Sequence, residues 1–434
     1  MIRRIFGAFL VLCIAFSASF AEAQEADLAA LSATARANSR DAGAQSAYGR
    51  ALLRAGRYRD AQASFRRAAQ LSRGSVEALY DVARVAFAQG DYRQAQTACR
   101  ALSRYRTSAL FHVCNARTFL VWNRSSRAFD ELTEATNIDN NNFEALLALG
   151  DAHRIQSEAP QAEAAYRRAS SANPSSAEPD LGLARLYASA NRSADATAAL
   201  RRALSHDANS PDVLFELGRS LGNTPEAREL LTRAVAARPT WADAQAALGE
   251  VLLANGEAEA AERAFTDAIR LNDRLATAHA GLGRAKAARG DLATAERELR
   301  RALELVPNSP TAARALADLF AQSNRPEDAF EQYRVAADLN PSDPRALLSA
   351  TSLALTLHRD VLAAGFLDRL LEGDAELAPA LALYGDIMIA RQDRAGARTY
   401  YERALRGHGD LPDRARVQTA LRDASSGTAP AQRR

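Results

Sequence analysis

The chain contains one short motif that could supply a catalytic nucleophile. Residues 218–222 read Gly-Arg-Ser-Leu-Gly, which matches the G-x-S-x-G pattern of hydrolases and puts Ser220 in the place of the nucleophile. That motif works only on a strained turn from a strand into a helix, because such a turn exposes the serine beside an oxyanion hole. The surrounding residues have a helical pattern, so we interpret the match as coincidental and predict that the chain is not an enzyme.

The histidines and cysteines do not have the spacing of a metal or haem site. No two of the six histidines are separated by four residues on a common helix face, and the sequence contains neither CxxC nor CxxCH. Zinc ligation and covalent haem attachment depend on such spacings. We therefore predict that the chain binds no metal ion and no cofactor.

The first residues have the composition of a secretory signal peptide. Arg3 and Arg4 make the first four residues positively charged, an apolar run follows over 5–16, and Ala21-Glu22-Ala23 forms an A-x-A cleavage site. We expect residues 1–23 to be removed and the mature chain to be exported to the periplasm. The alternative is an uncleaved inner-membrane anchor, because the apolar run up to Phe20 is nearly long enough to span a bilayer. No later segment approaches that length, so we predict no membrane span after cleavage.

Export would leave Cys99 and Cys114 as the only cysteines of the mature chain. An oxidising compartment permits a disulfide between them, and closing a loop of about 15 residues stabilises a protein by roughly 3 kcal/mol. The alternative is a pair of buried thiols on packed helices. Spacing alone does not establish the geometry that a disulfide needs, so both alternatives remain open.

Composition favours helices and argues against nucleic-acid binding. Alanine, the best helix former, supplies 99 of the 434 residues, whereas aromatic residues supply only 6%. The net charge is +3, although nucleic-acid-binding proteins are usually strongly basic. These values predict an all-α protein that does not bind nucleic acid.

An alanine recurs along most of the chain at intervals of 34 residues, with one interval of 33 and one of 31. The eleven positions are Ala61, Ala95, Ala128, Ala162, Ala196, Ala227, Ala261, Ala295, Ala329, Ala363 and Ala397. A large apolar residue usually follows four residues later, and a glycine or alanine usually lies twelve residues earlier. These spacings predict two antiparallel helices per repeat, with the small residues at the closest approach and the large residue beside them.

Two segments show the repeat most clearly. One contains Leu149-Gly150, then Ala162-x-x-x-Tyr166 and Pro174, and the other contains Leu248-Gly249 and Ala261-x-x-x-Phe265. These residues resemble the tetratricopeptide repeat (TPR) family, and the whole chain is similar to tandem TPR proteins of the exported bacterial type. The resemblance implies an α-solenoid of about eleven helix-turn-helix units that form a right-handed superhelix.

The repeats define the expected domain organisation. We assign 24–41 to an N-terminal capping helix, 42–411 to eleven TPR units, 412–424 to a C-terminal capping helix and 425–434 to a disordered tail. The sixth repeat is three residues short, and there we expect Thr224 to cap a helix that begins at Pro225. Either the curvature of the superhelix changes at that repeat, or the deletion is neutral in a surface turn.

The resemblance indicates which residues face the concave surface. Five arginines occupy the same inward position in repeats of the N-terminal half: Arg50, Arg84, Arg117, Arg185 and Arg219. The first four stand eleven residues before the recurring alanine, and Arg219 stands eight before it because its repeat is three residues short. Other inward positions carry an apolar stripe: Tyr80, Phe87, Val113, Leu120, Leu147, Leu181 and Phe215. Guanidinium groups suit carboxylates and backbone carbonyls, and an apolar stripe can bury side chains of a peptide. We predict that these twelve residues form a partner-binding groove.

A second interpretation of the arginine row is structural. Acidic residues occupy another inward position in several repeats: Glu77, Glu144, Glu178, Asp212 and Asp243. The arginines could form ion pairs with these acids in neighbouring repeats, each pair contributing little to stability. The two interpretations are compatible, because different arginines can take different roles.

Charge and architecture together predict the function. Residues 42–210 hold 22 basic and 16 acidic residues, whereas 211–411 hold 24 basic and 30 acidic residues. This distribution favours acidic protein or peptide segments as partners of the N-terminal half. We predict a non-catalytic protein–protein interaction scaffold of the bacterial periplasm or envelope. The alternatives are a self-assembling homo-oligomer driven by the bipolar charge, and a regulatory subunit of an envelope enzyme or secretion complex.

Overall fold

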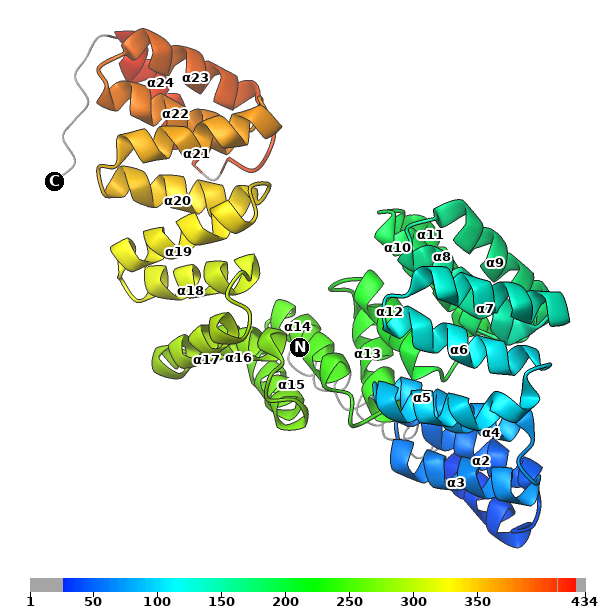
Figure 1. The fold of residues 1–434 in the computed structure, drawn as a ribbon. Coiled ribbons are helices and arrows are strands. Elements are labelled where there is room, and N and C mark those ends of the chain that lie inside the picture. The colour runs from blue at the N-terminus through cyan, green and yellow to red at the C-terminus, as the bar shows by residue number, and fades with distance from the viewer. Residues whose placement is uncertain (1–25, 412, 427–434) are drawn as a thin grey trace. The chain divides into compact units, whose positions relative to one another are not determined.

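The computed structural model describes residues 26–411 and 413–426, and within these residues the chain forms helices and no β-strand (Figure 1). The predicted signal peptide and residues 427–434 of the predicted tail lie outside the described residues. The fold divides into two compact units, unit 1 up to Asn255 and unit 2 from Gly256 onward. The predicted all-α solenoid is confirmed, and each unit is described by itself.

Unit 1 starts with a helix over residues 26–37 and continues to α14. Its helices are α2 (Ala42–Arg54), α3 (Tyr58–Leu71), α4 (Val76–Ala88), α5 (Tyr92–Ala101), η1 (Leu102–Tyr105), α6 (Ala109–Val121), α7 (Ser125–Ile138), α8 (Phe143–Ile155), α9 (Ala159–Ala172), α10 (Glu178–Ser189), α11 (Ser193–His206), α12 (Pro211–Ser220), α13 (Pro225–Ala237) and α14 (Ala242–Ala254).

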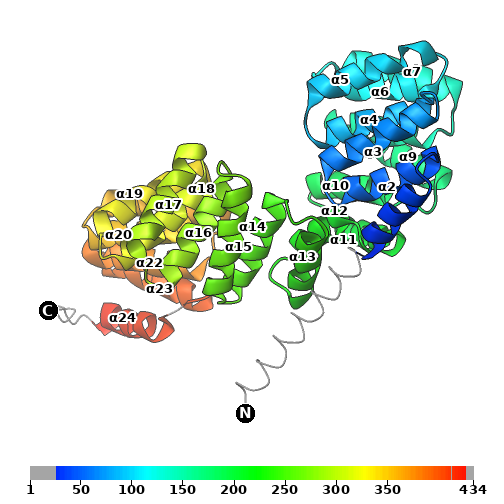
Figure 2. The same cartoon turned by 90° about the horizontal axis from the view of Figure 1, so that it is seen from below.

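Unit 2 runs from α15 to α24. Its helices are α15 (Ala258–Leu271), α16 (Ala276–Ala288), α17 (Leu292–Leu305), α18 (Pro310–Gln322), α19 (Pro326–Leu339), α20 (Pro344–Thr356), α21 (Asp360–Gly373), α22 (Ala378–Ala390), α23 (Arg394–Arg406) and α24 (Arg414–Ser426). In each unit, consecutive helices pack as antiparallel pairs and successive pairs stack on one another (Figure 2).

Small residues stand where the paired helices approach most closely, as the repeat pattern predicts. A Cβ atom added to Gly150 on α8 would lie 2.5 Å from the ring of Tyr166 on α9, and one added to Gly385 would lie 2.5 Å from the ring of Tyr401. Both tyrosines are almost completely buried. The prediction of small residues beside a large one is therefore confirmed in both units.

The turns inside the repeats adopt the left-handed backbone conformation that the sequence predicts for glycine. Gly90 between α4 and α5 has a φ of 71°, and Gly290 between α16 and α17 has a φ of 84°. Other repeats place residues with side chains in the same conformation: Asn123, Ser157, Asn191, Asn324, His358 and Gln392. Glycine is thus the preferred residue at this turn but not a required one.

The short sixth repeat begins its second helix as predicted. The Oγ1 atom of Thr224 accepts a hydrogen bond from the backbone N–H of Ala227 at 3.1 Å, and Pro225 is the first residue of α13. The first helix of this repeat, α12, ends at Ser220 after ten residues, whereas α8 and α10 have 13 and 12. The missing residues therefore shorten α12.

A final helix, α24, covers the end of unit 2. Val417 is fully buried against Leu381 and Tyr401, and the guanidinium of Arg416 lies 2.8 Å from the carboxylate of Asp386. The helix reaches Ser426, two residues beyond the predicted capping helix, so residues 425 and 426 are helical rather than part of a tail. The sequence Ser-Ser-Gly offers no sharp stop before residue 427, which explains the misplaced boundary.

Candidate functional site

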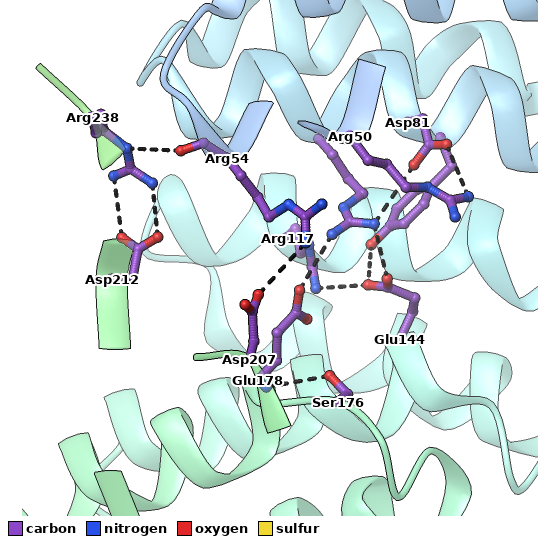
Figure 3. A network of polar contacts seen from close by, with 12 residues as sticks. Arg50, Arg54, Asp81, Arg117, Glu144, Ser176, Glu178, Asp207, Asp212 and Arg238 are labelled. Carbon is purple, nitrogen blue, oxygen red and sulfur yellow. Dashed lines mark hydrogen bonds and ion pairs between the residues drawn. The ribbon is translucent and has the colours of Figure 1, made fainter. Parts of the chain in front are cut away.

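Two arginines of the predicted groove converge on one carboxylate inside unit 1 (Figure 3). Arg117 on α6 donates to Glu144 on α8 at 3.0 Å, and Arg84 on α4 lies 3.6 Å from the other oxygen of the same carboxylate. The hydroxyl of Tyr80 donates to Glu144 at 2.9 Å. Arg84 also lies 3.4 Å from Glu178 on α10, which links the second repeat to the fifth. These side chains form a continuous polar network among the first helices of four repeats.

The network is buried enough to shift the pKa values of its members. Burial alone would raise the pKa of Glu144, but Arg117 and Arg84 outweigh it and hold the pKa below the ordinary value. Burial raises the pKa of Tyr80 well above its ordinary value. For Glu178, burial prevails over the attraction of Arg84 and the pKa is raised. The carboxylate of Glu144 is therefore the charged centre that the two arginines neutralise.

The remaining arginines of the row stay open to solvent. Arg50 is 60% exposed and lies 3.6 Å from Asp81, whose carboxylate is buried. Arg185 is exposed and reaches Glu216 at 3.3 Å. Arg219 is exposed, lies 5.4 Å over the ring of Phe215 and forms no ion pair within the residues that the structure describes. We call Arg50, Arg185 and Arg219 the open arginines.

The apolar stripe is largely used by the fold itself. Tyr80, Val113, Leu147 and Phe215 are each less than 9% exposed. Phe87, Leu120 and Leu181 are only partly buried. The predicted site residues thus separate into a packed interior, which includes Arg84 and Arg117, and an accessible part formed by the open arginines and the three partly buried apolar side chains. The structural interpretation applies to Arg84 and Arg117, which pair with Glu144, whereas partner binding by the accessible residues stays a prediction.

The two cysteines form a disulfide in the structure. The Cα atoms of Cys99 on α5 and Cys114 on α6 lie 5.5 Å apart, and both residues are buried. Helix α5 has ten residues and continues directly into η1, so the second helix of this repeat ends in a 3-10 turn. The bond ties the second repeat to the third.

The hydrolase-like motif lies in helical backbone. Ser220 is the last residue of α12, and its hydroxyl donates to the carbonyl of Leu217 at 2.9 Å. A Cβ atom on Gly218 would lie 2.7 Å from Leu231, so that glycine serves helix packing. Among residues 26–411 and 413–426, no group of three or more His, Cys, Asp or Glu side chains is arranged to hold a metal ion.

Two kinds of side-chain pairing occur within several repeats and were not predicted from the sequence. Tyr166 and Tyr401 donate to Asp151 and Asp386, each at 2.7 Å, and Tyr333 pairs with Asp318 in the same way. In each case the Asp occupies the arginine-row position and the Tyr follows the recurring alanine by four residues. Comparing these two positions across repeats would have revealed the pairing from the sequence.

The second recurring pairing involves two histidines at the same repeat position. His112 and His279 each contact a glutamate at 2.7 Å through Nδ1, and each places Nε2 near a backbone carbonyl of the preceding turn. The glutamates are Glu131 and Glu298, nineteen residues later in both cases. Searching for histidine pairs along the chain misses this arrangement, because each histidine pairs with a carboxylate.

None of the helices in the described part of the chain is both long and apolar enough to cross a bilayer.

None of the curated proteins compared with this chain matches it. Two models of the tetratricopeptide repeat match the sequence, one over residues 52–112 and 153–214, the other over 219–276, 280–344 and 314–382. The chain therefore belongs to the TPR family, and it is a protein-interaction scaffold.

Several solved structures are similar to the chain. Yeast Tom70 is 12% identical, with 89% of this chain and 96% of that one covered and a TM-score of 0.45. TTC0263, a TPR protein of Thermus thermophilus, is 28% identical over 42% of this chain and 100% of its own, with a TM-score of 0.38. YrrB, a TPR protein with an unusual peptide-binding site, is 24% identical over 42% of this chain and 95% of its own, with a TM-score of 0.34.

Proposed function

We propose that the chain is an exported scaffold whose unit 1 binds acidic segments of partner proteins through the open arginines. The observation that carries this proposal is the contrast within one row of arginines. Arg84 and Arg117 are largely buried in the polar network. Arg50 and Arg185 are exposed and each contacts one carboxylate, and Arg219 is exposed and forms no ion pair among the described residues. An exposed guanidinium whose fork is not already bound to a carboxylate is available to an incoming one.

The chemistry of the ligand follows from the charge and the accessible side chains. Carboxylates of a partner would contact the open arginines, while Phe87, Leu120 and Leu181 are accessible enough to contact its apolar side chains. The excess of basic residues over 42–210 attracts such a segment from a distance. We therefore favour an acidic segment with interspersed apolar residues.

Two features support export. Residues 1–23 have the pattern of a cleavable signal peptide, and the disulfide between Cys99 and Cys114 is of a kind that persists in oxidising compartments. Mass spectrometry of the protein purified from its native cells tests this part. We expect an N-terminal Gln24 and no free thiol, whereas an intact residue 1 or two free thiols would contradict it.

Peptide binding tests the ligand. The mature chain is titrated with a fluorescent oligoglutamate peptide, and an oligoglutamine peptide serves as the uncharged comparison. Replacing all three open arginines with Glu removes favourable contacts of about 0.5 kcal/mol each, so we expect affinity to fall by about tenfold or more. Arg84 and Arg117 are left unchanged, because their substitution would disturb the polar network.

A matched variant separates specific contact from general charge. Arg66, Arg67 and Arg93 are exposed on the second helices α3 and α5, and replacing all three with Glu causes the same change in net charge. We expect this variant to bind oligoglutamate nearly as tightly as the parent. Equal losses in the two variants, or equal binding of oligoglutamate and oligoglutamine, would show that the open arginines are not the binding site.

A further inference from the structure

The turn between the two helices of the first repeat lies against segments far along unit 1. The backbone carbonyl of Arg54, at the end of α2, accepts a hydrogen bond from Nε of Arg238 at 3.3 Å, although the two residues are 184 positions apart (Figure 3). The guanidinium of Arg54 lies 3.6 Å from the carboxylate of Asp207, which follows α11. We call these contacts between Arg54, Asp207 and Arg238 the clasp.

The far side of the clasp is held firmly in place. Arg238 is only 13% exposed and binds Asp212 through both of its terminal nitrogens, at 3.3 and 2.8 Å. Its guanidinium also lies 4.5 Å over the ring of Trp241. These local contacts orient Arg238 whether or not the first repeat is nearby, so its Nε is a preformed donor for the approaching turn.

The turn at Gly56 in the first repeat is the near side of the clasp, and its backbone approaches the side chain of Arg238 closely. Gly56 has a φ of 70°, and a Cβ atom at this position would lie 2.8 Å from the side chain of Arg238 and 3.5 Å from Thr240. Glycine therefore serves two purposes here, because it permits the left-handed turn and leaves room for Arg238.

The contacts that join the two sides are weak. One is a single hydrogen bond at 3.3 Å, and the other is an ion pair at 3.6 Å whose side chains are 59% and 30% exposed. Exposed ion pairs of this kind contribute little and are screened by salt. The clasp thus joins a firmly held Arg238 to the first repeat through two weak polar contacts. Such contacts can be broken without disturbing the helices on either side, as a gate requires.

We propose that the clasp is an autoinhibitory gate of unit 1, in which Asp207 occupies Arg54 until an acidic segment of a partner displaces it. Arg54 stands one helical turn after the open arginine Arg50 on α2, so a carboxylate bound at Arg50 is close to Arg54. Displacement frees the first repeat from Arg238 and makes Arg54 available as a further carboxylate contact beside the open arginine Arg50. This inference rests on the proposed acidic ligand and adds the regulation of the same site.

The opening can be measured as a distance in the full chain. Arg59→Cys on α3 and Glu229→Cys on α13 place spin labels at exposed positions on the two sides of the clasp. We expect one short, narrow distance distribution at low salt and a longer, broader one at high salt. Asp207→Asn and Arg54→Gln remove the same ion pair from opposite sides, so both should produce the longer distribution already at low salt.

A matched control accounts for the change in charge. Asp195→Asn also removes one negative charge from unit 1, but Asp195 pairs with Arg192 at 2.7 Å on the surface of α11, outside the clasp. Its distance distribution should equal that of the parent. Far-ultraviolet circular dichroism of every variant establishes that the helices are intact.

Binding kinetics connect the gate to the ligand. Oligoglutamate should associate roughly two- to fivefold faster with Asp207→Asn than with Asp195→Asn, as expected when one half-exposed ion pair no longer competes. If the peptide binds but the distances and rates are the same in all variants, the gate is wrong and the proposed ligand stands. If oligoglutamate binds neither the parent nor the opened variants, the proposed acidic ligand itself is wrong.

Discussion

The packing around the ring of Tyr166 predicts that Gly182→Ala destabilises the contact between two neighbouring repeats. It lies between two glycines, Gly150 of its own repeat and Gly182 on the first helix of the next. A Cβ atom at Gly182 would lie 2.4 Å from one ring carbon and 2.7 and 2.9 Å from two others. Gly182→Ala therefore inserts one methyl group into the contact between neighbouring repeats.

The expected magnitude follows from two opposing effects. Replacing glycine by alanine inside a helix stabilises that helix by about 1 kcal/mol. Overpacking a dense core costs about 1–3 kcal/mol. The ring cannot retreat easily, because Gly150 contacts its other side and its hydroxyl is bound to Asp151 at 2.7 Å. We place the cost near the upper end and expect a net loss of about 1–2 kcal/mol.

A second glycine provides a matched control. Gly365 lies inside α21, is exposed, and a Cβ atom added to it would have no neighbouring atom within 4 Å. Gly365→Ala gains the helix propensity without the overpacking, so it should stabilise its helix by up to about 1 kcal/mol. Native-state hydrogen exchange gives the local opening free energy of α10 and α21 separately, which suits an array of repeats.

The signs of the two effects test the reasoning. Protection should fall in α10 for Gly182→Ala and rise in α21 for Gly365→Ala. In a Tyr166→Leu background the ring is gone, so adding Gly182→Ala should no longer destabilise α10. If Gly182→Ala increases protection in the parent, or if its cost persists without the ring, contact with Tyr166 is not the reason for glycine at this position.

Three further predictions concern stability, and urea denaturation followed by circular dichroism measures each. Glu144→Gln leaves Arg117 buried without its carboxylate and should cost about 2–3 kcal/mol. The pKa of Glu144 is lower in the folded than in the unfolded chain, so its carboxylate contributes fully to the free energy of unfolding above the unfolded pKa. That contribution is lost as the pH falls through the folded pKa. The free energy of unfolding of Glu144→Gln should therefore fall less steeply in acid than that of the parent. Gly407→Ala would bring a Cβ atom within 2.4 Å of the carbonyl oxygen of Glu376 and should cost about 1–3 kcal/mol, whereas an unchanged midpoint would refute that contact. Thr224→Ala removes the helix cap of α13 and should cost about 1 kcal/mol, while Thr224→Ser should cost almost nothing.

The repeat fold could be predicted from the sequence because its determinants are local. The recurring alanine, the large residue four positions later and the glycine twelve positions earlier all lie within one helix pair, as Gly150 and Tyr166 illustrate. The cap at Thr224 and the left-handed turn at Gly90 also depend only on neighbouring residues. Such features repeat along the chain, so each repeat supports the interpretation of the others.

The roles of the individual arginines could not be predicted in the same way. Arg84 and Arg185 occupy the same repeat position, yet the first is held in the polar network and the second is exposed. The difference depends on which repeats the curvature of unit 1 brings together. The carboxylate of Glu178 lies close to Arg84, for example, although the two residues are 94 positions apart in the sequence. No spacing rule covers such a separation, so the accessible part of the row emerged only from the structure.

The hydrogen bonds from Tyr166, Tyr333 and Tyr401 join the second helix of a repeat to the first helix of the same repeat. Each bond fastens a hairpin internally instead of attaching it to its neighbour. If the array is pulled from its ends, these three repeats should separate from their neighbours as intact hairpins before their own helices part. Extension would then occur in steps whose length is set by one hairpin.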